Sequence, residues 1–162
     1  MAQTIKAIRN GVIDDTHGVF DPAVRRHFKG VDHILHAGDI GDQSVIEQLE
    51  QIAPVTAVSG NVDDEEQSGF PFEAVIELAG RRIATRHILY KGGKLTKDGR
   101  AFLDRERPDL CVFGHTHQPK PNGSARCDRS TQTQPDDDGS GCHARWEFLW
   151  AKMIQLRLLA LC

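Results

Sequence analysis

The chain has 162 residues, a formal net charge of −3 and a hydrophobic content of 39%. This length suits one domain with a single sizeable core. The slightly acidic balance lacks the basic surplus on which non-specific nucleic-acid binding depends, and no apolar run reaches the roughly 18 residues of a membrane-spanning helix. The N-terminus shows no signal-peptide stretch and the cysteines form no CxxC pair, so we expect a cytoplasmic protein with free thiols.

Strands and helices alternate in the first sixty residues. Apolar stretches of strand length cover residues 5–13, 33–37 and 54–58. Amphipathic helices are predicted after the Asp-Pro dipeptide at 21–22 and over residues 43–51. This β-α-β-α-β order predicts a sheet with parallel pairing.

Antiparallel strands follow in the next part of the chain. Residues 74–78 and 82–85 flank a short Ala-Gly-Arg segment and are typical of a hairpin. Thr96 is a suitable N-cap for a helix that extends to Leu103, and residues 110–113 form a further apolar strand. The fold class is therefore α/β, with parallel and antiparallel pairing combined.

Polar side chains follow the successive predicted strands. They are Asp15, His17, Asp39, Asn61, His87, His115 and His117. Because sites in open α/β sheets form beyond the carboxyl ends of the strands, these side chains can converge although a hundred residues separate them. Gly38, Gly60 and Gly114 precede three of them and suit a close approach of the backbone. Oxygen and imidazole ligands without thiolate favour Mn²⁺, Fe, Zn²⁺ or Ni²⁺.

Four short blocks occur in order along the chain: Asp15-Thr16-His17-Gly18, Gly38-Asp39, Gly60-Asn61 and Gly114-His115-Thr116-His117. As a set they resemble the signature of the calcineurin-like metallophosphoesterases, in particular the small prokaryotic phosphodiesterase branch. The resemblance covers roughly residues 5–119. It implies a four-layer α/β/β/α sandwich with two mixed sheets and a dinuclear metal centre.

The resemblance also implies a ligand for each position of that centre. One metal ion is held at Asp15, His17 and His117, the other at Asn61, His87 and His115, and Asp39 bridges the two. Of these, the resemblance gives Asp39, Asn61 and His115 a part in catalysis as well. Two divalent ions about 3.5–4 Å apart can clamp a phosphoryl oxygen and supply a hydroxide at neutral pH. We expect two such ions, with Mn²⁺ favoured and Fe, Zn²⁺ or Ni²⁺ as alternatives.

The function predicted in this way is that of a metal-dependent phosphoesterase. A metal-bridging hydroxide would attack the phosphorus of a small phosphodiester, with no covalent enzyme intermediate. Neither a nucleic acid nor a membrane is expected as a partner, and a homo-oligomer is left open. The alternative is a non-catalytic scaffold, because a subunit of the retromer coat has the same fold and acts through protein–protein contacts.

The chain departs from the family pattern at two places near the predicted centre. Family members usually have Thr-His-Gly where this chain has Thr85-Arg86-His87, so a bulge or loop is expected to turn His87 towards the site. Many relatives have a histidine, assigned as the leaving-group acid, where this chain has Val62. We therefore expect a preference for esters with good leaving groups.

Three further polar features have structural interpretations. Asn10 occupies an apolar position of a buried strand, where an unpaired amide costs about 1–3 kcal/mol. His36 is expected to pack beside the site without binding metal. The acidic residues 63–66 are most simply a solvated run.

The composition changes at about residue 120. Residues 120–143 contain three hydrophobic residues among 24, and the chain then becomes apolar to its end. We divide the chain into a metallophosphoesterase domain, 1–119, and an atypical tail, 120–162, which leaves the second sheet incomplete at its C-terminal end. A shifted reading frame or an unrelated replacement would explain the tail. In the alternative, the apolar part beginning at Trp146 covers a sheet edge as a helix or strand pair.

Overall fold

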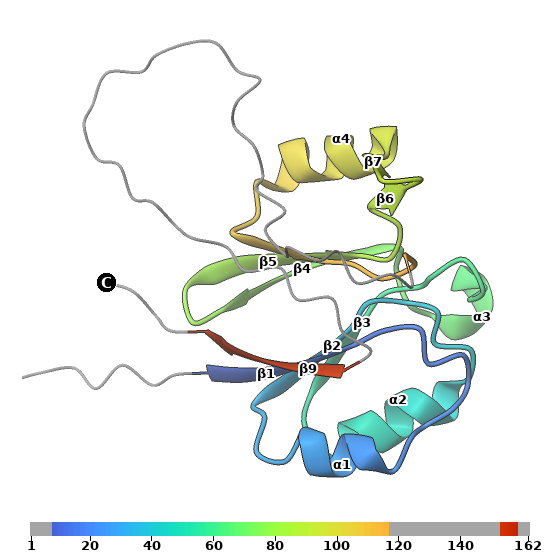
Figure 1. Cartoon of the computed structure of the whole chain (residues 1–162), viewed down its shortest axis with the longest axis vertical. Coiled ribbons are helices and arrows are strands. Elements are labelled where there is room, and N and C mark those ends of the chain that lie inside the picture. Colours follow the sequence, from blue (N-terminus) through green and yellow to red (C-terminus); the bar gives the residue numbers. More distant parts are fainter. Residues whose placement is uncertain (1–7, 117–152, 159–162) are drawn as a thin grey trace, which may run out of the picture.

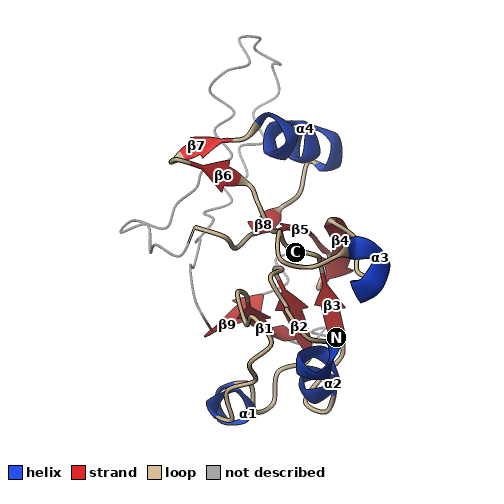
Figure 2. Cartoon of the chain, turned by 90° about the vertical axis from the view of Figure 1, so that its right-hand side faces the viewer, coloured by secondary structure: helices blue, strands red, loops and turns tan. Residues whose placement is uncertain are grey.

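The computed structural model describes residues 8–116 and the backbone of residues 153–158. The first sheet contains β1 (Ile8–Ile13), β2 (His33–His36), β3 (Val55–Ala57) and β9 (Met153–Leu158), in the order β3-β2-β1-β9. The first three strands are parallel, joined by α1 (Ala23–His27) and α2 (Gln43–Glu50), whereas β9 is antiparallel to β1 (Figure 2). The predicted β-α-β-α-β order and parallel pairing are confirmed.

The second sheet has three described strands. They are β4 (Glu73–Leu78), β5 (Arg81–Arg86) and β8 (Leu110–Val112), with β5 in the middle. The predicted hairpin pairs β4 with β5 in antiparallel fashion, and β8 is parallel to β5. Its turn, Ala79-Gly80, has positive φ at both residues, as a type I′ hairpin turn requires. The α/β class with two mixed sheets is confirmed.

Figure 1 shows α1 and α2 against the first sheet and α4 against the second. Three hydrophobic clusters join these elements. One joins the first sheet to α1 and α2 through side chains such as Ile34 and Leu49. The second lies between the sheets, where Val12 and Leu35 meet Ile83 and other residues of the second sheet. The third joins the second sheet to α4 (Lys97–Glu106), whose N-cap Thr96 accepts a hydrogen bond from the backbone as predicted.

The sequence interpretation missed two small elements. A hairpin of β6 (Tyr90–Lys91) and β7 (Lys94–Leu95) precedes α4, and α3 (Glu65–Ser68) forms one turn of helix in the acidic run. The Gly92-Gly93 pair, with positive φ at both positions, was the available signal for the hairpin. Neither α3 nor any other described helix has the length and apolar character needed to cross a bilayer.

The tail contributes a strand to the first sheet. Residues 153–158 pair with the whole length of β1, from Ile8 opposite Leu158 to Ile13 opposite Met153. This agrees with the interpretation that an apolar part of the tail covers a sheet edge. The rest of the predicted tail, including Trp146 and Trp150, lies outside the described residues.

Asn10 lies on β1 and is fully buried. By strand alternation its side chain shares a face with Val12, which packs between the two sheets. Both its amide nitrogen and its amide oxygen lack a hydrogen-bond partner among the described residues. Among the described residues the expected unpaired amide is therefore present, and nothing in this part of the chain compensates its desolvation.

Replacing this amide should stabilise the protein. In Asn10→Val, a branched side chain of similar size removes two buried polar atoms, so the free energy of unfolding should rise by about 1–3 kcal/mol. Urea denaturation should show a higher midpoint with an unchanged slope. Asn10→Ala serves as the control, because it also removes the amide but leaves a cavity and should gain less. A lower midpoint for Asn10→Val than for the natural chain would contradict this interpretation.

Candidate metal centre

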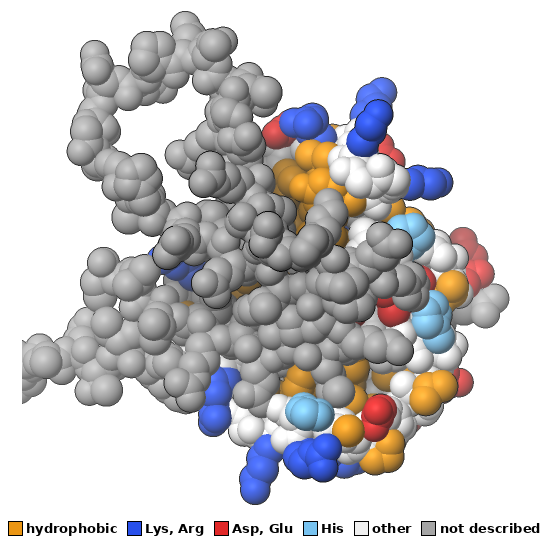
Figure 3. Space-filling view, viewed as in Figure 1, with side chains coloured by type: hydrophobic (Ala, Val, Ile, Leu, Met, Phe, Trp, Pro, Cys, Tyr) orange, Lys and Arg blue, Asp and Glu red, His pale blue; other side chains and the backbone are white. Residues whose placement is uncertain are grey.

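The predicted ligands gather at the carboxyl ends of strands from both sheets. Asp15 and His17 follow β1, Asp39 follows β2, His87 follows β5 and His115 follows β8. Figure 2 looks onto this end of the sheets, and in Figure 3 histidine and acidic side chains gather on the same side, towards α3. The two sheets thus contribute ligands from opposite sides of one site.

Two groups of side chains bring their ligand atoms within metal-binding reach. Asp15, His17 and Asp39 form one group, and Asp39, His87 and His115 form the other. Within each group the ligand atoms all lie within 4.8 Å of one another. Asp39 is common to both groups and is almost fully buried. A single carboxylate therefore stands between two candidate cation positions.

The backbone at these residues is strained. Asp15, His17, Asp39 and His115 have φ of 51°, 47°, 53° and 68°. A positive φ is uncommon for a residue with a side chain and costs on the order of 1–3 kcal/mol where the surrounding structure imposes it. Among the described residues that are not glycine, only Ala79 and Arg107 share this conformation. Four of the six positive-φ residues that are not glycine among those described are thus predicted ligands, which is the distribution expected of a candidate functional site.

Glycines allow the close approach that the sequence predicted. A Cβ on Gly60 would lie 2.1 Å from Asp39 Oδ1, and one on Gly38 would lie 2.7 Å from the side chain of His87. A Cβ on Gly114 would lie 3.0 Å from His87 Nδ1. Side chains at these three positions would push the ligand groups apart, so glycine is required by packing.

His87 enters the site without a bulge. On β5, Ile83 faces the first sheet and Ala84 faces α4, so strand alternation places Thr85 and His87 on the side of the first sheet. The strand ends at Arg86, and His87 follows in a bend with its side chain 2% exposed. The sequence predicted a bulge or a loop at this point, and the structure has the loop, as the bend that His87 occupies directly after the strand.

The ring of His87 presents one nitrogen to the carboxylates. Its Nδ1 lies 2.7 Å from the backbone carbonyl of Ala37, which can only accept, so Nδ1 carries the proton of that hydrogen bond. Its Nε2 lies 3.2 Å from Asp39 Oδ1 and 3.9 Å from Asp15 Oδ1. This buried nitrogen makes no hydrogen bond with the described residues. An imidazole whose second nitrogen is held by a carbonyl is the usual form of a metal ligand.

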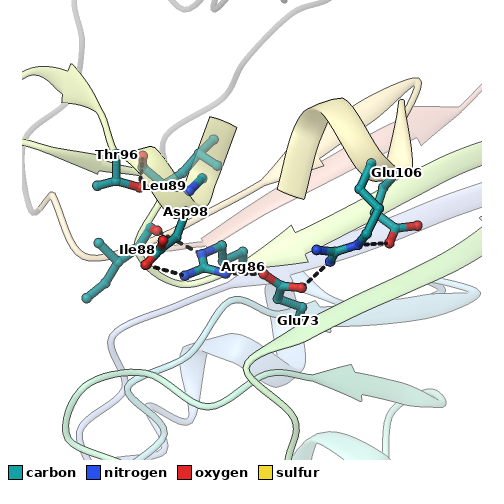
Figure 4. Close-up of polar contacts among 9 residues, drawn as sticks. Glu73, Arg86, Ile88, Leu89, Thr96, Asp98 and Glu106 are labelled. Atoms are coloured by element: carbon teal, nitrogen blue, oxygen red, sulfur yellow. Dashed lines mark hydrogen bonds and ion pairs between the residues drawn. The ribbon is translucent and has the colours of Figure 1, made fainter. Parts of the chain in front are cut away.

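Arg86, the residue before His87, forms its polar contacts on the side of the second sheet that faces α4. Arg86 donates through Nε to the carbonyl of Ile88 at 3.2 Å and pairs with Glu73 on β4 (Figure 4). Its other guanidinium nitrogen lies 4.0 Å from Asp98 on α4. This ion-pair network thus holds the residue before His87 on the side of the sheet opposite to the site.

The loop after β3 approaches Asp39 through its backbone. Asn61 is exposed, and the N–H of the next residue, Val62, donates to Asp39 Oδ1 at 3.1 Å. Asp63 accepts hydrogen bonds from the backbone N–H groups of Ile40, Gly41 and Gly60 at 2.8–3.0 Å. Asp63 thus ties the loop after β3 to the loop that carries Asp39.

Asp63 corrects one interpretation of the acidic run. It was expected to be a solvated charge, but it is half-buried and bonded to three backbone groups. Burial alone would raise the pKa of Asp63, but these hydrogen bonds and the nearby His36 lower it below its usual value. In the sequence, only its position two residues after the predicted ligand Asn61 distinguished Asp63 from its acidic neighbours.

The donors fit divalent cations. Carboxylates and imidazoles suit Mn²⁺, Fe, Zn²⁺ or Ni²⁺, and the buried Nε2 of His87 has no other described partner for its lone pair. A divalent cation between the two buried carboxylates would also offset the cost of burying them together. His117, the remaining predicted ligand, lies outside the described residues.

Comparison with known proteins agrees with this geometry. The model of the calcineurin-like phosphoesterase superfamily domain matches residues 8–134. The chain belongs to this superfamily. It is 34% identical over 118 residues to a probable metallophosphoesterase of Methanocaldococcus jannaschii and 35% identical over 115 residues to one of Methanothermobacter thermautotrophicus. These alignments cover 67% of this chain but 58% and 66% of the two relatives.

Solved structures with a similar fold are also found. Vacuolar protein sorting 29 of Cryptosporidium parvum superposes with a TM-score of 0.55 at 25% identity, over 69% of this chain and 66% of that one. A predicted phosphoesterase of Streptococcus pneumoniae superposes with a TM-score of 0.52 at 24% identity, over 70% and 65%. The chain thus spans about two thirds of these proteins.

A calcineurin-like centre of this kind should stabilise the fold when loaded. Adding Mn²⁺ to EDTA-treated protein should raise the midpoint of thermal unfolding by several degrees, since a ligand at 100 times its Kd contributes about 2.7 kcal/mol. Asp39→Asn should lose most of this shift, because both ligand groups share Asp39. Asp104→Asn, an exposed change on α4, should keep it. Equal shifts for the two variants would contradict the assignment of Asp39.

Proposed function

We propose that this protein is a metal-dependent phosphoesterase that hydrolyses phosphodiesters at a dinuclear centre. The observation that carries the proposal is Asp39, a buried carboxylate shared by two groups of ligand atoms that reach it from different strands. Two bound divalent ions would supply a hydroxide nucleophile at neutral pH and neutralise charge on the phosphoryl group. Membership of the calcineurin-like superfamily supports metal-dependent phosphoester chemistry.

In this proposal each residue of the site has a defined part. Asp39 bridges the two ions, and the remaining ligands divide into one set of Asp15, His17 and His117 and another of Asn61, His87 and His115. Strained backbone at four of these residues favours a site built in advance, so that binding a phosphate needs little rearrangement. Asn61 and His115 are the more exposed members of their set and would face the substrate.

The proposal also covers the metal ion, the substrate and the complete fold. Mn²⁺ is the proposed ion, and Fe, Zn²⁺ or Ni²⁺ would suit the same oxygen and imidazole donors. The substrate is a small phosphoester, bound in the cytoplasm. The complete fold is a four-layer α/β/β/α sandwich, which the three hydrophobic clusters between successive layers support.

A non-catalytic scaffold is the second candidate. The similarity to vacuolar protein sorting 29 of Cryptosporidium parvum favours it, because that name belongs to a sorting protein and not to a hydrolase. In a scaffold the ligand residues would be retained for structure, and protein contacts would carry the function. Catalysis that depends on Asp39 separates the two candidates.

Hydrolysis of bis-p-nitrophenyl phosphate provides that test. With added Mn²⁺ the natural chain should release p-nitrophenol, and Asp39→Ala should lose at least about a hundredfold in rate, because both ion positions depend on Asp39. Asp104→Asn is the matched control and should retain the full rate. If the natural chain and Asp39→Ala give equal rates, the enzyme proposal fails and the scaffold is favoured.

The rate should also depend on the leaving group. Val62 lies beside Asp39, with its N–H bound to Asp39 Oδ1 and its side chain 51% exposed, and it has no proton to donate. Rates should therefore fall steeply from p-nitrophenyl to alkyl esters of the same phosphate. Val62→His should reduce this dependence by supplying an acid, whereas Val62→Leu should not. Equal rates for both kinds of ester with the natural chain would show that protonation is supplied elsewhere.

A further inference from the structure

A buried histidine lies next to the ligand loops and has no part in the proposed chemistry. His36 is the last residue of β2 and is fully buried. It lies three residues before Asp39, outside both groups of candidate ligand atoms. Both of its ring nitrogens nevertheless have hydrogen-bond partners in the loops that carry the ligands.

The direction of each of these hydrogen bonds is determined by the groups involved. The backbone N–H of Gly38 donates to His36 Nδ1 at 3.2 Å, so Nδ1 carries no proton. The proton of the neutral ring is then on Nε2, which donates to Thr16 Oγ1 at 3.0 Å. Thr16 Oγ1 donates its own proton to the carbonyl of Ile40 at 3.0 Å. Gly38, His36, Thr16 and Ile40 thus form one chain of hydrogen bonds with a single polarity, which we call the Thr16–His36 relay.

The environment keeps the ring neutral, as this chain requires. Burial lowers the pKa of His36 to about 3, with a raising effect from Asp63 and a further lowering effect from His87. A singly protonated ring can donate through one nitrogen and accept through the other. The relay is therefore intact at neutral pH.

The relay acts on the most strained part of the site. Thr16 lies between Asp15 and His17, and the relay ends on either side of Asp39, at Gly38 and Ile40. The backbones of the two loops also hydrogen-bond directly, from Asp15 to Gly38 and from His17 to Asp39. Asp15, His17 and Asp39 all have positive φ, so their conformations persist only while such contacts hold them.

We propose that the Thr16–His36 relay positions Asp15 and His17 against Asp39 and so sets the affinity of one of the two cation positions. Thr16 and His36 are positioning residues, which act through the ligands without touching the ion. The inference rests on the proposed metal centre.

The effect should be confined to the group of Asp15, His17 and Asp39. In the other group, His87 is fixed by the carbonyl of Ala37 and by the backbone hydrogen bond from Gly114 to His87. Its neighbour Arg86 is held by Glu73 on the far side of the second sheet. None of these contacts passes through the relay, and the N–H of Val62 holds Asp39, the shared carboxylate, independently of it. Loss of the relay should therefore leave the second position intact.

Mn²⁺ binding to Thr16→Val and Thr16→Ser tests the proposal. Valine has nearly the shape of threonine but no hydroxyl, whereas serine keeps the hydroxyl. In calorimetric titration of metal-free protein, Thr16→Val should bind one Mn²⁺ roughly 10–100-fold more weakly and the other unchanged, the usual effect of removing an outer hydrogen bond. Thr16→Ser should bind both ions as the natural chain does.

His36→Asn provides an independent variant. Its amide oxygen can still accept from Gly38, but it has no atom in reach of Thr16, so it should show the same selective loss as Thr16→Val. The double variant should lose no more than the larger single loss, because both changes break one chain of hydrogen bonds. Thermal unfolding in EDTA checks that each variant is folded. Thr16→Ala is used in place of a variant that does not fold.

The outcomes separate the two proposals. If the natural chain binds no Mn²⁺, the proposed metal centre fails. If it binds two ions, and Thr16→Val and His36→Asn bind them with unchanged affinity, the metal centre stands and the relay is overturned. Equal weakening of both ions, or equal weakening in Thr16→Val and Thr16→Ser, also overturns the relay, since it would show a general loss of structure.

Discussion

The convergence of buried carboxylates and imidazoles on Asp39 is the constraint on which the rest of this structure depends. Asp15, Asp39 and His87 are each almost fully buried. His87 Nε2 lies 3.2 Å from an oxygen of Asp39 and 3.9 Å from an oxygen of Asp15. Burying such groups close together is costly, and a cation between them would offset this cost. The fold must therefore hold them together from outside, with backbone and side chains that do not bind the ion.

Three kinds of contact do this. Hydrogen bonds join the loops after β1 and β2 directly, and the side chain of Asp63 joins the loops after β2 and β3. The carbonyl of Ala37, which follows β2, holds the ring of His87, which follows β5 of the second sheet. On the opposite face of the second sheet, Arg86 pairs with Glu73. Hydrogen bonds to buried backbone groups stabilise the site more than the exposed ion pairs of α4 do, because water screens the charges of those ion pairs.

Glycine and strain have a common cause in this site. Five strands end within a small volume, so the backbone must turn sharply and pass close to neighbouring side chains. At the candidate ligands Asp15 and Asp39, where a side chain is present, the residue adopts a positive φ at a cost. Where no ligand is needed, as at Gly38 and Gly60, the absence of Cβ provides the room. The hydrophobic clusters on both faces of the first sheet supply the stability that offsets this strain.

The sequence by itself determined the order of the strands, the parallel core of the first sheet and the set of residues at the strand ends, because apolar periodicity and glycine positions are local properties. It could not determine which way His87 points, since this depends on the register of β5 between the two sheets and not on distance from a motif. Nor could it separate Asp63 from its acidic neighbours or join Thr16 to His36, because their partners are backbone groups and side chains from other loops. Those assignments belong to the tertiary structure, which alone brings the ends of distant strands together.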